Sequence, residues 1–571
     1  MSDVSKRKNQ SCKPASDSQQ IRGWTRGRRL RVSLPIFVVL LGILMAVSTL
    51  TAASWNYAPT GQTIETLSSD TAITFNNTTG GDLAKQGDYE VTQRYVTIKA
   101  QQSSTGETQD INVLIREPKN AGNNRPGVVF IHGAGYGTCD NSFGDMAYDL
   151  SSAGFVTAVL DKPVWSTNDA TRDYPASAAA YDQVINLLRS FDNVDAEQVG
   201  IYATSEGTWI SSYLLQSDSD VAFQVLLSPM VYSPRQSLGF LAAQDFALVG
   251  AHDGYQSIVC RIFHLDVSLF GFDNLDIDTL DPQAYSIPTL VAYGTKDVMT
   301  AQVEGTEKIV AMAHKAGNWN VTVRTYSIAN HVLRLGDEAN SGTPFADDYV
   351  NDVIDWAVGT IQGLEQTSER VAGAQLYQSI AVPLDLEANR GLTVYLVVLH
   401  VGMLLLLMVM AVLWLIVAIR KIHARIHGHR YELGFLHGFG NALITLTITT
   451  MATLLLFAAG LGEVIMSVVK LAWGGAPTEN PGMMYWSWPV IQIVCVIVVW
   501  AWSRVFTRLL EVAGNRGLTR WPPRRGAIKQ IISSWQPVLA STRFGRVVFW
   551  FTVFAMLNVL LVFAFWGLFI Y

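Results

Sequence analysis

The chain has 571 residues, more than one ordinary compact domain holds and enough for two or three. Apolar residues make up 49% of it and charged residues 15%, against roughly 25% charged residues in a typical soluble chain. This composition excludes intrinsic disorder and, with a mean hydropathy of +0.22, indicates a membrane protein. Residues 54–390 hold 18 Lys or Arg and 41 Asp or Glu between two basic flanks, which excludes a nucleic-acid binder with clustered positive charge.

The first predicted elements are a basic cytoplasmic tail, residues 1–32, and an uncharged stretch, residues 33–53. The stretch has 21 residues and is long enough to cross a bilayer as a helix. We expect an uncleaved transmembrane signal anchor, because the apolar core of a cleaved signal peptide is usually about 7–15 residues long. A signal peptide cleaved near Ala53 is the alternative, and either one sends residue 54 onward across the membrane.

Residues 54–89 are rich in Thr, Asn, Gly and Ser and predict a linker, and residues 90–361 predict a folded exported domain. Apolar runs that predict strands cover residues 110–118, 127–133, 155–163, 199–207, 223–230, 289–297 and 321–331. Runs that predict helices lie near residues 142–153, 174–191, 208–216, 301–316 and 345–361. This alternation indicates the α/β class, with a mostly parallel sheet covered by helices on both faces.

Residues 230–286 form a connection between two predicted strands that is far longer than usual. Its large apolar side chains suit either an apolar lid over a site or a small core of the insertion itself. These side chains are Phe240, Leu241, Phe246, Phe263, Leu269, Phe270 and Phe272.

A second linker, residues 362–390, leads to a predicted four-helix transmembrane region, residues 391–571. Its apolar stretches cover residues 391–419, 441–470, 485–503 and 547–570, so we expect about five transmembrane helices in all. The connections 420–430 and 504–546 are basic, whereas 474–488 holds no Lys or Arg. Because basic loops stay in the cytoplasm, we expect a multi-pass cell-membrane protein with a cytoplasmic N-terminus and residues 54–390 outside.

Two kinds of side chain stand out near these spans. Trp473, Tyr485, Trp486 and Trp488 cluster at one predicted membrane interface, as an aromatic belt would. His400 and Glu463 are ionisable groups in or near the spans. We expect Glu463 near the outer interface and His400 neutral and hydrogen-bonded to a neighbouring helix, because no further charge completes a transport relay.

The sequence Ala203-Thr204-Ser205-Glu206-Gly207 lies between a predicted strand and a predicted helix. A serine on so tight a turn is exposed above the sheet, and small residues two before and two after it avoid clashes. The segment resembles the nucleophile elbow of the α/β-hydrolase family, with Ala203 in place of the usual first glycine. A chance match to so short a pattern is the alternative.

The sequence His132-Gly133-Ala134-Gly135-Tyr136-Gly137 follows the predicted strand 127–133. It is similar to the oxyanion loop of esterases, whose backbone N–H groups stabilise the negative oxygen of a tetrahedral intermediate. We expect the N–H of Glu206 and one from Gly133 or Ala134 to serve in this way. His132 itself is expected to be structural.

Asp297 and His331 each follow a later predicted strand. In the α/β-hydrolase family the order along the chain is serine, acid, histidine, and Ser205, Asp297 and His331 obey it. The serine needs a base for its proton, and the histidine needs a carboxylate that orients it. The resemblance therefore implies an α/β-hydrolase domain with these three catalytic residues. We expect the alternatives Asp161, His252, His264 and His314 to be surface or packing residues.

Residues 194–200, which lead into the serine strand, resemble dienelactone-hydrolase-like and prolyl-oligopeptidase-like members of that family. The resemblance covers about residues 90–361, and in such hydrolases an insertion like 230–286 often caps the active site. It leaves the five spans unexplained.

Cys139 and Cys260 are the only cysteines of the exported domain, where disulfides persist. A disulfide between them would tie the insertion to the oxyanion loop, and two buried free thiols are the alternative. Cys12 falls in the tail and Cys495 in a span. No metal site or cofactor is expected, since His423, His427 and His429 lie in a basic cytoplasmic connection.

The function expected is that of a membrane-anchored serine hydrolase, of the esterase, lipase or acyltransferase type, with an outward-facing active site. The spans, the apolar insertion and the absence of a cationic patch favour a lipophilic ester or acyl substrate and a lipid bilayer as partners. A prolyl-oligopeptidase-like peptidase and a catalytically inactive binding or assembly module are the alternatives. The sequence leaves the oligomeric state open.

Overall fold

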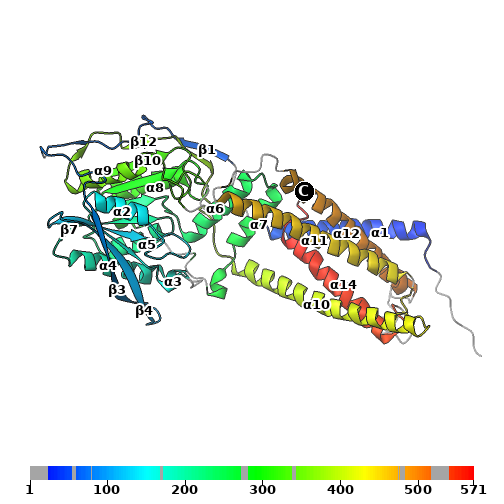
Figure 1. Ribbon diagram of the computed structural model, residues 1–571. Helices are drawn as coiled ribbons and strands as arrows, with labels where there is room; N and C mark the ends of the chain where they lie inside the picture. Colours follow the sequence, from blue (N-terminus) through cyan, green and yellow to red (C-terminus); the bar gives the residue numbers. More distant parts are fainter. Residues whose placement is uncertain are drawn as a thin grey trace, which may run out of the picture. The chain divides into compact units, whose positions relative to one another are not determined.

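The computed structural model (Figure 1) describes residues 23–53, 59–78, 80–167, 172–271, 275, 281–336, 342–436, 438–472, 475, 482–515 and 539–570. Most of the tail, with Cys12, and also Phe272 and Trp473, lie outside the described residues. The chain divides into two compact units. We call Met1–Leu50, Val398–Leu455 and Ile491–Tyr571 the helical unit, and Thr51–Val397 with Leu456–Val490 the sheet unit.

A nine-stranded sheet forms the centre of the sheet unit, in the order β12-β10-β9-β8-β7-β5-β6-β4-β3. The strands are β3 (Val91–Gln101), β4 (Thr108–Pro118), β5 (Arg125–Ile131), β6 (Val156–Leu160), β7 (Val194–Thr204), β8 (Gln224–Leu227), β9 (Thr289–Gly294), β10 (Val321–Tyr326) and β12 (Val371–Gly373). Neighbouring strands from β6 to β12 pair in parallel, and β4 alone runs in the opposite direction. Every residue of β6, β8, β9 and β10 is buried, as expected for strands covered on both faces.

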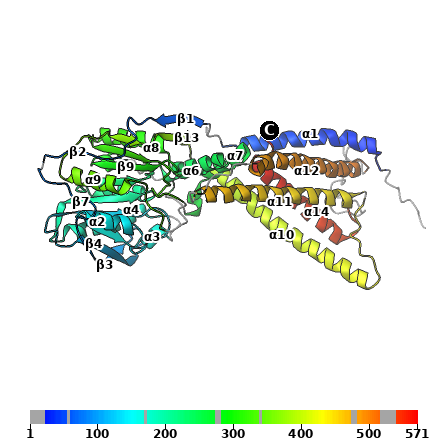
Figure 2. The ribbon, with the colours of Figure 1, turned by 45° about the horizontal axis from the view of Figure 1, so that its top comes forward.

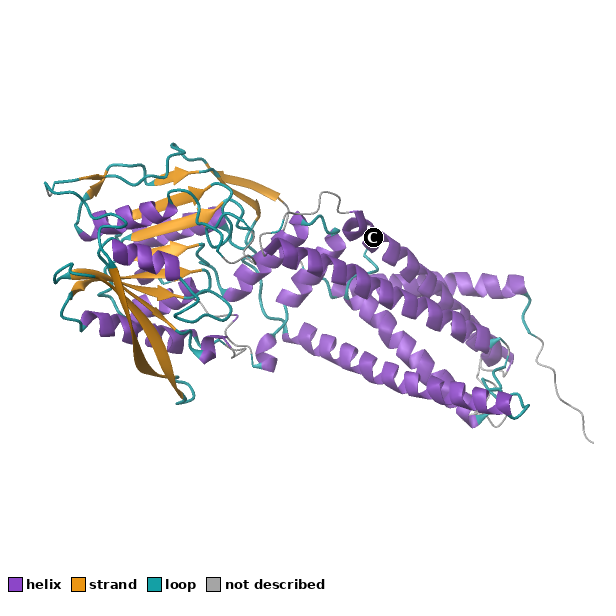
Figure 3. Ribbon diagram, in the orientation of Figure 1, coloured by secondary structure: helices purple, strands orange, loops and turns teal. Residues whose placement is uncertain are grey.

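Helices cover both faces of this sheet, as Figures 2 and 3 show. Helices α2 (Gly144–Ser152) and α9 (Tyr349–Ile361) contribute to one large apolar core with the strands. Helices α4 (Tyr174–Arg189), α5 (Gly207–Ser217) and α8 (Gln302–Lys315) pack against strands as well. The start of α4 shows how the sequence determines a boundary, because the Asp173 carboxylate accepts the Ala176 N–H. The predicted α/β fold, a mostly parallel sheet with helices on both faces, is therefore present.

Short strands lie in both segments predicted as linkers, and the sheet unit extends beyond the predicted limits 90 and 361. Strand β1 (Pro59–Ile64) pairs with β13 (Leu376–Ile380), and β2 (Phe75–Asn76) pairs with β11 (Glu365–Gln366). Strand β12 also extends the main sheet at its edge. These short strands are held by backbone pairing across the unit, which a polar local sequence does not reveal.

The described part of the insertion 230–286, which we call the cap, includes two helices and two short 3₁₀ helices. They are α6 (Pro234–Leu248), α7 (Asp253–Phe263), η1 (Val267–Phe270) and η3 (Pro282–Tyr285). Phe240 and Phe246 are buried, whereas Phe270 is 53% exposed. The apolar side chains of the cap therefore divide between its interior and its surface.

Helix α7 packs on the first turns of α12 (Gly482–Asn515), within the sheet unit. The hydroxyls of Tyr255 and Ser487 lie 2.9 Å apart, and the Tyr255 ring meets Trp488 edge to face at 4.9 Å. Trp488 is only 2% exposed. It is thus a packing residue beneath the cap and departs from the predicted aromatic belt, whereas Tyr485 and Trp486 are exposed.

Five helices among the described residues are long and apolar enough to cross a membrane. They are α1 (Arg26–Leu50), α10 (Arg390–Ile426), α11 (Phe439–Ala472), α12 and α14 (Arg543–Phe565). Each includes one of the five predicted spans or most of it. His400 Nε2 on α10 accepts a hydrogen bond from the indole N–H of Trp566, directly after α14, at 3.0 Å.

Helix α1 is an integral part of the helical unit. The Arg29 guanidinium makes two hydrogen bonds of 3.0 Å to the Glu511 carboxylate near the end of α12, and the Trp24 N–H makes a third. At the other end of α1, the Ser48 hydroxyl donates to the Ala564 carbonyl at 2.7 Å. The N-terminal segment and the end of α12 therefore lie at the same end of this unit.

Candidate active site

Ser205, Asp297 and His331 lie at the carboxyl ends of β7, β9 and β10, which are neighbours in the sheet with β8 between β7 and β9. Ligand sites of open parallel sheets form at these ends. The structure thus brings residues that are up to 126 positions apart in the sequence to one edge of the sheet.

The turn at Ser205 has the geometry of a nucleophile elbow. Ser205 adopts φ 51°, a left-handed conformation that is uncommon for any residue except glycine, and its N–H donates to the Leu227 carbonyl at 2.9 Å. A Cβ at Gly207 would lie 2.7 Å from the carbonyl oxygens of Ile131 and His132, so the turn requires glycine there. Ala203 is fully buried in β7, which accommodates its methyl group. Alanine in place of the usual first glycine is therefore compatible with the turn.

Asp297 and His331 are in direct contact, as predicted. His331 Nδ1 lies 2.9 Å from Asp297 Oδ1, and the carboxylate also accepts the Thr300 hydroxyl and the Met299 N–H. Burial would raise the pKa of Asp297, but His331 and then these two donors together hold it below its ordinary value. Asp297 is therefore a carboxylate that can orient His331 and stabilise its protonated form.

Ser205 follows β7 and His331 follows β10, and a hydrogen bond between their side chains is the prediction that completes the triad. The Ser228 hydroxyl, directly after β8, donates to the His331 carbonyl at 2.7 Å and so joins the ends of β8 and β10. Catalytic hydrogen bonds between serine and histidine are often long without substrate and shorten when it binds. The acid–histidine pair is formed, and the serine–histidine pair stays a prediction.

The glycine-rich loop lies directly beside the serine turn. A Cβ at Gly133 would be 3.1 Å from the Thr204 carbonyl and 3.4 Å from the Ser205 Cβ. His132 Nε2 lies 2.6 Å from the Leu160 carbonyl, and burial lowers the pKa of His132 to about 4. The ring is therefore neutral at pH 7 and donates from Nε2, which is the structural role expected of it.

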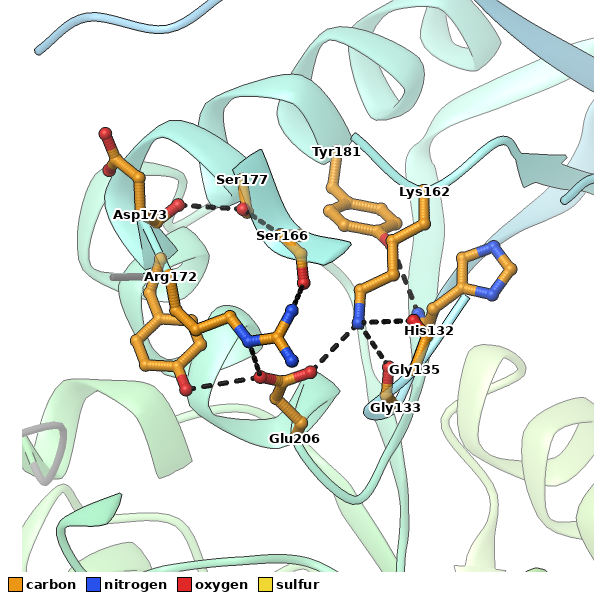
Figure 4. A network of polar contacts seen from close by, with 11 residues as sticks. His132, Gly133, Gly135, Lys162, Ser166, Arg172, Asp173, Ser177, Tyr181 and Glu206 are labelled. Atoms are coloured by element: carbon orange, nitrogen blue, oxygen red, sulfur yellow. Dashed lines mark hydrogen bonds and ion pairs between the residues drawn. The ribbon is translucent and has the colours of Figure 1, made fainter. Parts of the chain in front are cut away.

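Glu206 is buried in a network that the sequence did not predict (Figure 4). Its carboxylate pairs with Lys162 at 2.9 Å and Arg172 at 3.3 Å, and Tyr174 donates to it at 3.3 Å. Lys162 lies two residues after the end of β6, just as the predicted site residues lie shortly after their strands. That position was the available signal.

Asp245 on α6 was also missed. Its side chain is fully buried, and among the described residues neither carboxylate oxygen has a hydrogen-bond partner. Burial, with a smaller effect of the Asp297 charge, raises the pKa of Asp245 to about 8. A lone aspartate in a long insertion carries no sequence signal of such an environment.

The other candidates take part in packing. Asp161 accepts the Cys139 N–H at 2.9 Å, and the His252 ring caps the start of α7 through the Gly254 N–H. His264 contacts the Cys260 carbonyl at 2.7 Å, and His314 stacks on Trp319 at 4.0 Å. These contacts agree with the predicted surface and packing roles.

The candidate disulfide is not formed, because Cys139 and Cys260 are both buried free thiols. Cys139 lies in the core beneath the sheet with Met146 and Tyr202, whereas Cys260 lies on α7 of the cap. Burial raises the pKa of each thiol to about 12. The alternative of two buried thiols therefore holds.

A small cleft opens between the cap and the loop that follows β9. Its lining is mostly apolar and includes Met230, Tyr232, Phe240 and Met299. Thr300, which bonds the Asp297 carboxylate, also lines it. Among the described residues, no group of three or more His, Cys, Asp or Glu side chains is arranged to hold a metal ion.

No protein-family model matches the chain, and no curated protein matches it. Similar solved structures are α/β hydrolases of the dienelactone-hydrolase-like, esterase and dipeptidyl-peptidase-like kinds. A protein assigned as a dipeptidyl aminopeptidase IV from Bacteroides ovatus is 16% identical over 48% of this chain, with a TM-score of 0.34. The match spans only 36% of that protein.

A protein assigned as a dienelactone hydrolase from Klebsiella pneumoniae is 13% identical, with a TM-score of 0.30, over 46% of this chain and 98% of its own. Fungal esterases from Rhizomucor miehei give 17% identity and a TM-score of 0.33, over 48% of this chain and 84% of their own. The sheet unit has an α/β-hydrolase fold. The strand order and the turn at Ser205 support this assignment. The similarity to the solved structures is too low to support it.

Proposed function

We propose that the chain is a membrane-attached serine hydrolase of the esterase type, which acts on an ester or acyl group through an acyl-enzyme. The observation that carries the proposal is the 2.9 Å contact between Asp297 and His331, at the same sheet edge as the strained turn of Ser205. A serine, a base and an orienting acid in this arrangement are what acyl transfer requires.

In the first step, Ser205 Oγ adds to the substrate carbonyl carbon and its proton passes to His331 Nε2. Asp297, at Nδ1, holds the ring in the required tautomer and stabilises the imidazolium. The tetrahedral intermediate then expels the alcohol, which takes the proton from His331. Water or another acceptor attacks the acyl-enzyme by the same route, so hydrolysis and acyl transfer differ only in the acceptor.

The negative oxygen of the intermediate needs fixed donors. The N–H of Glu206, at the N-terminus of α5, and an N–H of the loop after β5 are the proposed donors. The apolar cleft beside Asp297 favours an apolar acyl chain over a charged substrate. A lipophilic ester is therefore the substrate class that we propose.

The proposed orientation has the N-terminal segment inside and residues 54–390 outside the cytoplasmic membrane. The contact of Arg29 with Glu511 supports it, because that contact puts the N-terminal segment at the same end as the basic connection 504–546. The packing of Ser48 on Ala564 supports retention of α1 as an anchor, since cleavage after it would remove a helix of the unit.

A membrane-impermeant fluorophosphonate probe tests the nucleophile and the orientation together. We expect it to label wild-type protein on intact cells and to modify Ser205. Ser205→Ala should abolish the labelling and reduce p-nitrophenyl ester turnover to background, while membrane insertion stays unchanged.

Permeabilised cells provide the control. Labelling only after permeabilisation would reject the proposed orientation, whereas the proposed serine-hydrolase activity would stand. Wild-type turnover in Ser205→Ala would reject the nucleophile and leave the binding or assembly module as the better reading.

A further inference from the structure

The glycine-rich loop is folded around one side chain. Lys162 Nζ donates to the Gly133 carbonyl at 2.6 Å and to the Gly135 carbonyl at 3.2 Å. The Lys162 backbone N–H donates to the Gly137 carbonyl at 2.9 Å. Three alternate carbonyls of the loop therefore bond to a single residue, which Figure 4 shows for Gly133 and Gly135.

Lys162 is itself held firmly in place. Its side chain is fully buried and pairs with Glu206, the residue that follows Ser205 in the turn. Glu206 also pairs with Arg172, whose guanidinium donates to the Ser166 carbonyl. The ion pair thus connects the glycine-rich loop to the serine turn through buried contacts only.

These contacts determine which way one peptide of the loop points. In a planar trans peptide the carbonyl of one residue and the N–H of the next point in opposite directions. Because the Gly133 carbonyl points at buried Lys162, the Ala134 N–H points away from it, and Ala134 is exposed. Gly133 is also the loop residue that packs against Thr204 and Ser205.

We propose that Lys162 is a positioning residue for the oxyanion site: it orients the Gly133–Ala134 peptide so that the Ala134 N–H, together with the Glu206 N–H, holds the oxyanion. This inference rests on the proposed serine-hydrolase function and assigns the loop donor to Ala134 in preference to Gly133. Lys162 does not touch the reacting atoms and acts through the loop.

The energetics of the buried Lys162–Glu206 ion pair indicate that it does more than stabilise the fold. Burial lowers the pKa of Lys162, and the Glu206 charge opposes that shift. A buried ion pair adds little net stability over apolar side chains of the same size. The pair is therefore better explained by what it orients. The network of Lys162, Arg172 and Glu206 also has one excess positive charge, which favours an oxyanion nearby.

Lys162→Met in the purified full-length protein tests the inference. This variant retains the length of the side chain but removes its donors. We expect kcat on a p-nitrophenyl ester to fall about 10²–10³-fold, as on loss of one oxyanion donor, with KM changed less than about threefold. Affinity for a trifluoromethyl ketone, whose serine adduct carries the oxyanion, should fall by the same factor as kcat.

Two further variants separate positioning from stability. Lys162→Met with Glu206→Met also removes the buried carboxylate that loses its Lys162 partner, so it should recover thermal stability without recovering kcat. Arg189→Met breaks the ion pair with Asp218, between the ends of α4 and α5, and should lose stability while keeping wild-type kcat.

Wild-type ketone affinity in Lys162→Met, or full recovery of kcat in the double variant, would overturn the inference. A fall of kcat in Arg189→Met equal to that in Lys162→Met would also overturn it, because instability alone would then explain the loss. If wild-type Ser205 does not react with the ketone at all, the proposed function fails, and this inference fails with it.

Discussion

A buried carboxylate at the strand ends of the sheet and one in the cap differ in their hydrogen bonds and in the direction of their pKa shift. At the strand ends, Asp297 accepts hydrogen bonds from His331, Thr300 and Met299, and its pKa lies below the ordinary value. In the cap, Asp245 is equally buried, but neither of its oxygens has a partner among the described residues. Its pKa is raised to about 8.

The difference shows that the fold prepares a carboxylate for catalysis at the strand ends and does not do so in the cap. A buried carboxylate with three donors stays ionised and can orient a histidine, whereas one without donors is stable only when protonated. The strand ends are therefore a preorganised site. The cap contains a polar group whose cost the surrounding contacts must offset.

The largest effect is expected at the strand ends, from Asp297→Asn. The amide cannot hold His331 in the tautomer that accepts the serine proton, so kcat should fall about 10⁴-fold. Circular dichroism and membrane insertion should match wild type, since Asn keeps the shape of the side chain. A loss of less than tenfold would show that Asp297 is not the acid of the site and would remove its contrast with Asp245.

A smaller effect of opposite sign is expected in the cap, from Asp245→Asn. The folded-state pKa of about 8 lies above the ordinary 3.8, so the native state binds more protons between these values and stability falls as pH rises through that window. The Asp245→Asn variant has no carboxyl group at this position, so it does not lose stability in this pH window. Its Tm should exceed that of wild type by a few °C at pH 8, with no difference near pH 3.5.

Asp218→Asn is the matched control, because Asp218 is paired with Arg189 and its pKa is lowered. That variant should lose stability above pH 4, where the ionised pair contributes. If Asp245→Asn lowers Tm at pH 8, Asp245 has a partner in the folded state and the contrast with Asp297 is wrong.

Much of the sheet unit could be predicted from the sequence, because its elements are short, regular and marked by apolar runs. The segment with Ser205 combines a buried strand with small residues on both sides of the serine, and Asp297 and His331 each follow an apolar strand. A residue at the end of a parallel strand is placed by the fold itself. The resemblance to the α/β-hydrolase order therefore predicted that Asp297 would orient His331.

The remainder depends on pairings between distant residues that local patterns do not encode. Strand β1 contains Pro, Thr, Gly and Gln and has no alternating apolar pattern, so only its partner β13 defines it. Lys162 meets Glu206 across 44 positions through side chains alone. Asp245 becomes unusual only because the cap folds over it.

The smallest expected effect concerns the two thiols, Cys139 under the sheet and Cys260 in the cap. Both are buried, and the pKa of each is raised to about 12, so neither forms a reactive thiolate at pH 8. Native, non-reduced protein should therefore resist iodoacetamide, and denaturant without reductant should expose both thiols.

During slow labelling Cys260 should react severalfold faster than Cys139, because a region with an unsatisfied buried carboxylate opens locally at lower free energy. Mass spectrometry of the alkylated peptides over time measures both rates, and Asp245→Asn should bring them closer together. Equal rates in wild type would show that the cap is as stable as the sheet, and a peptide with both cysteines linked would restore the disulfide.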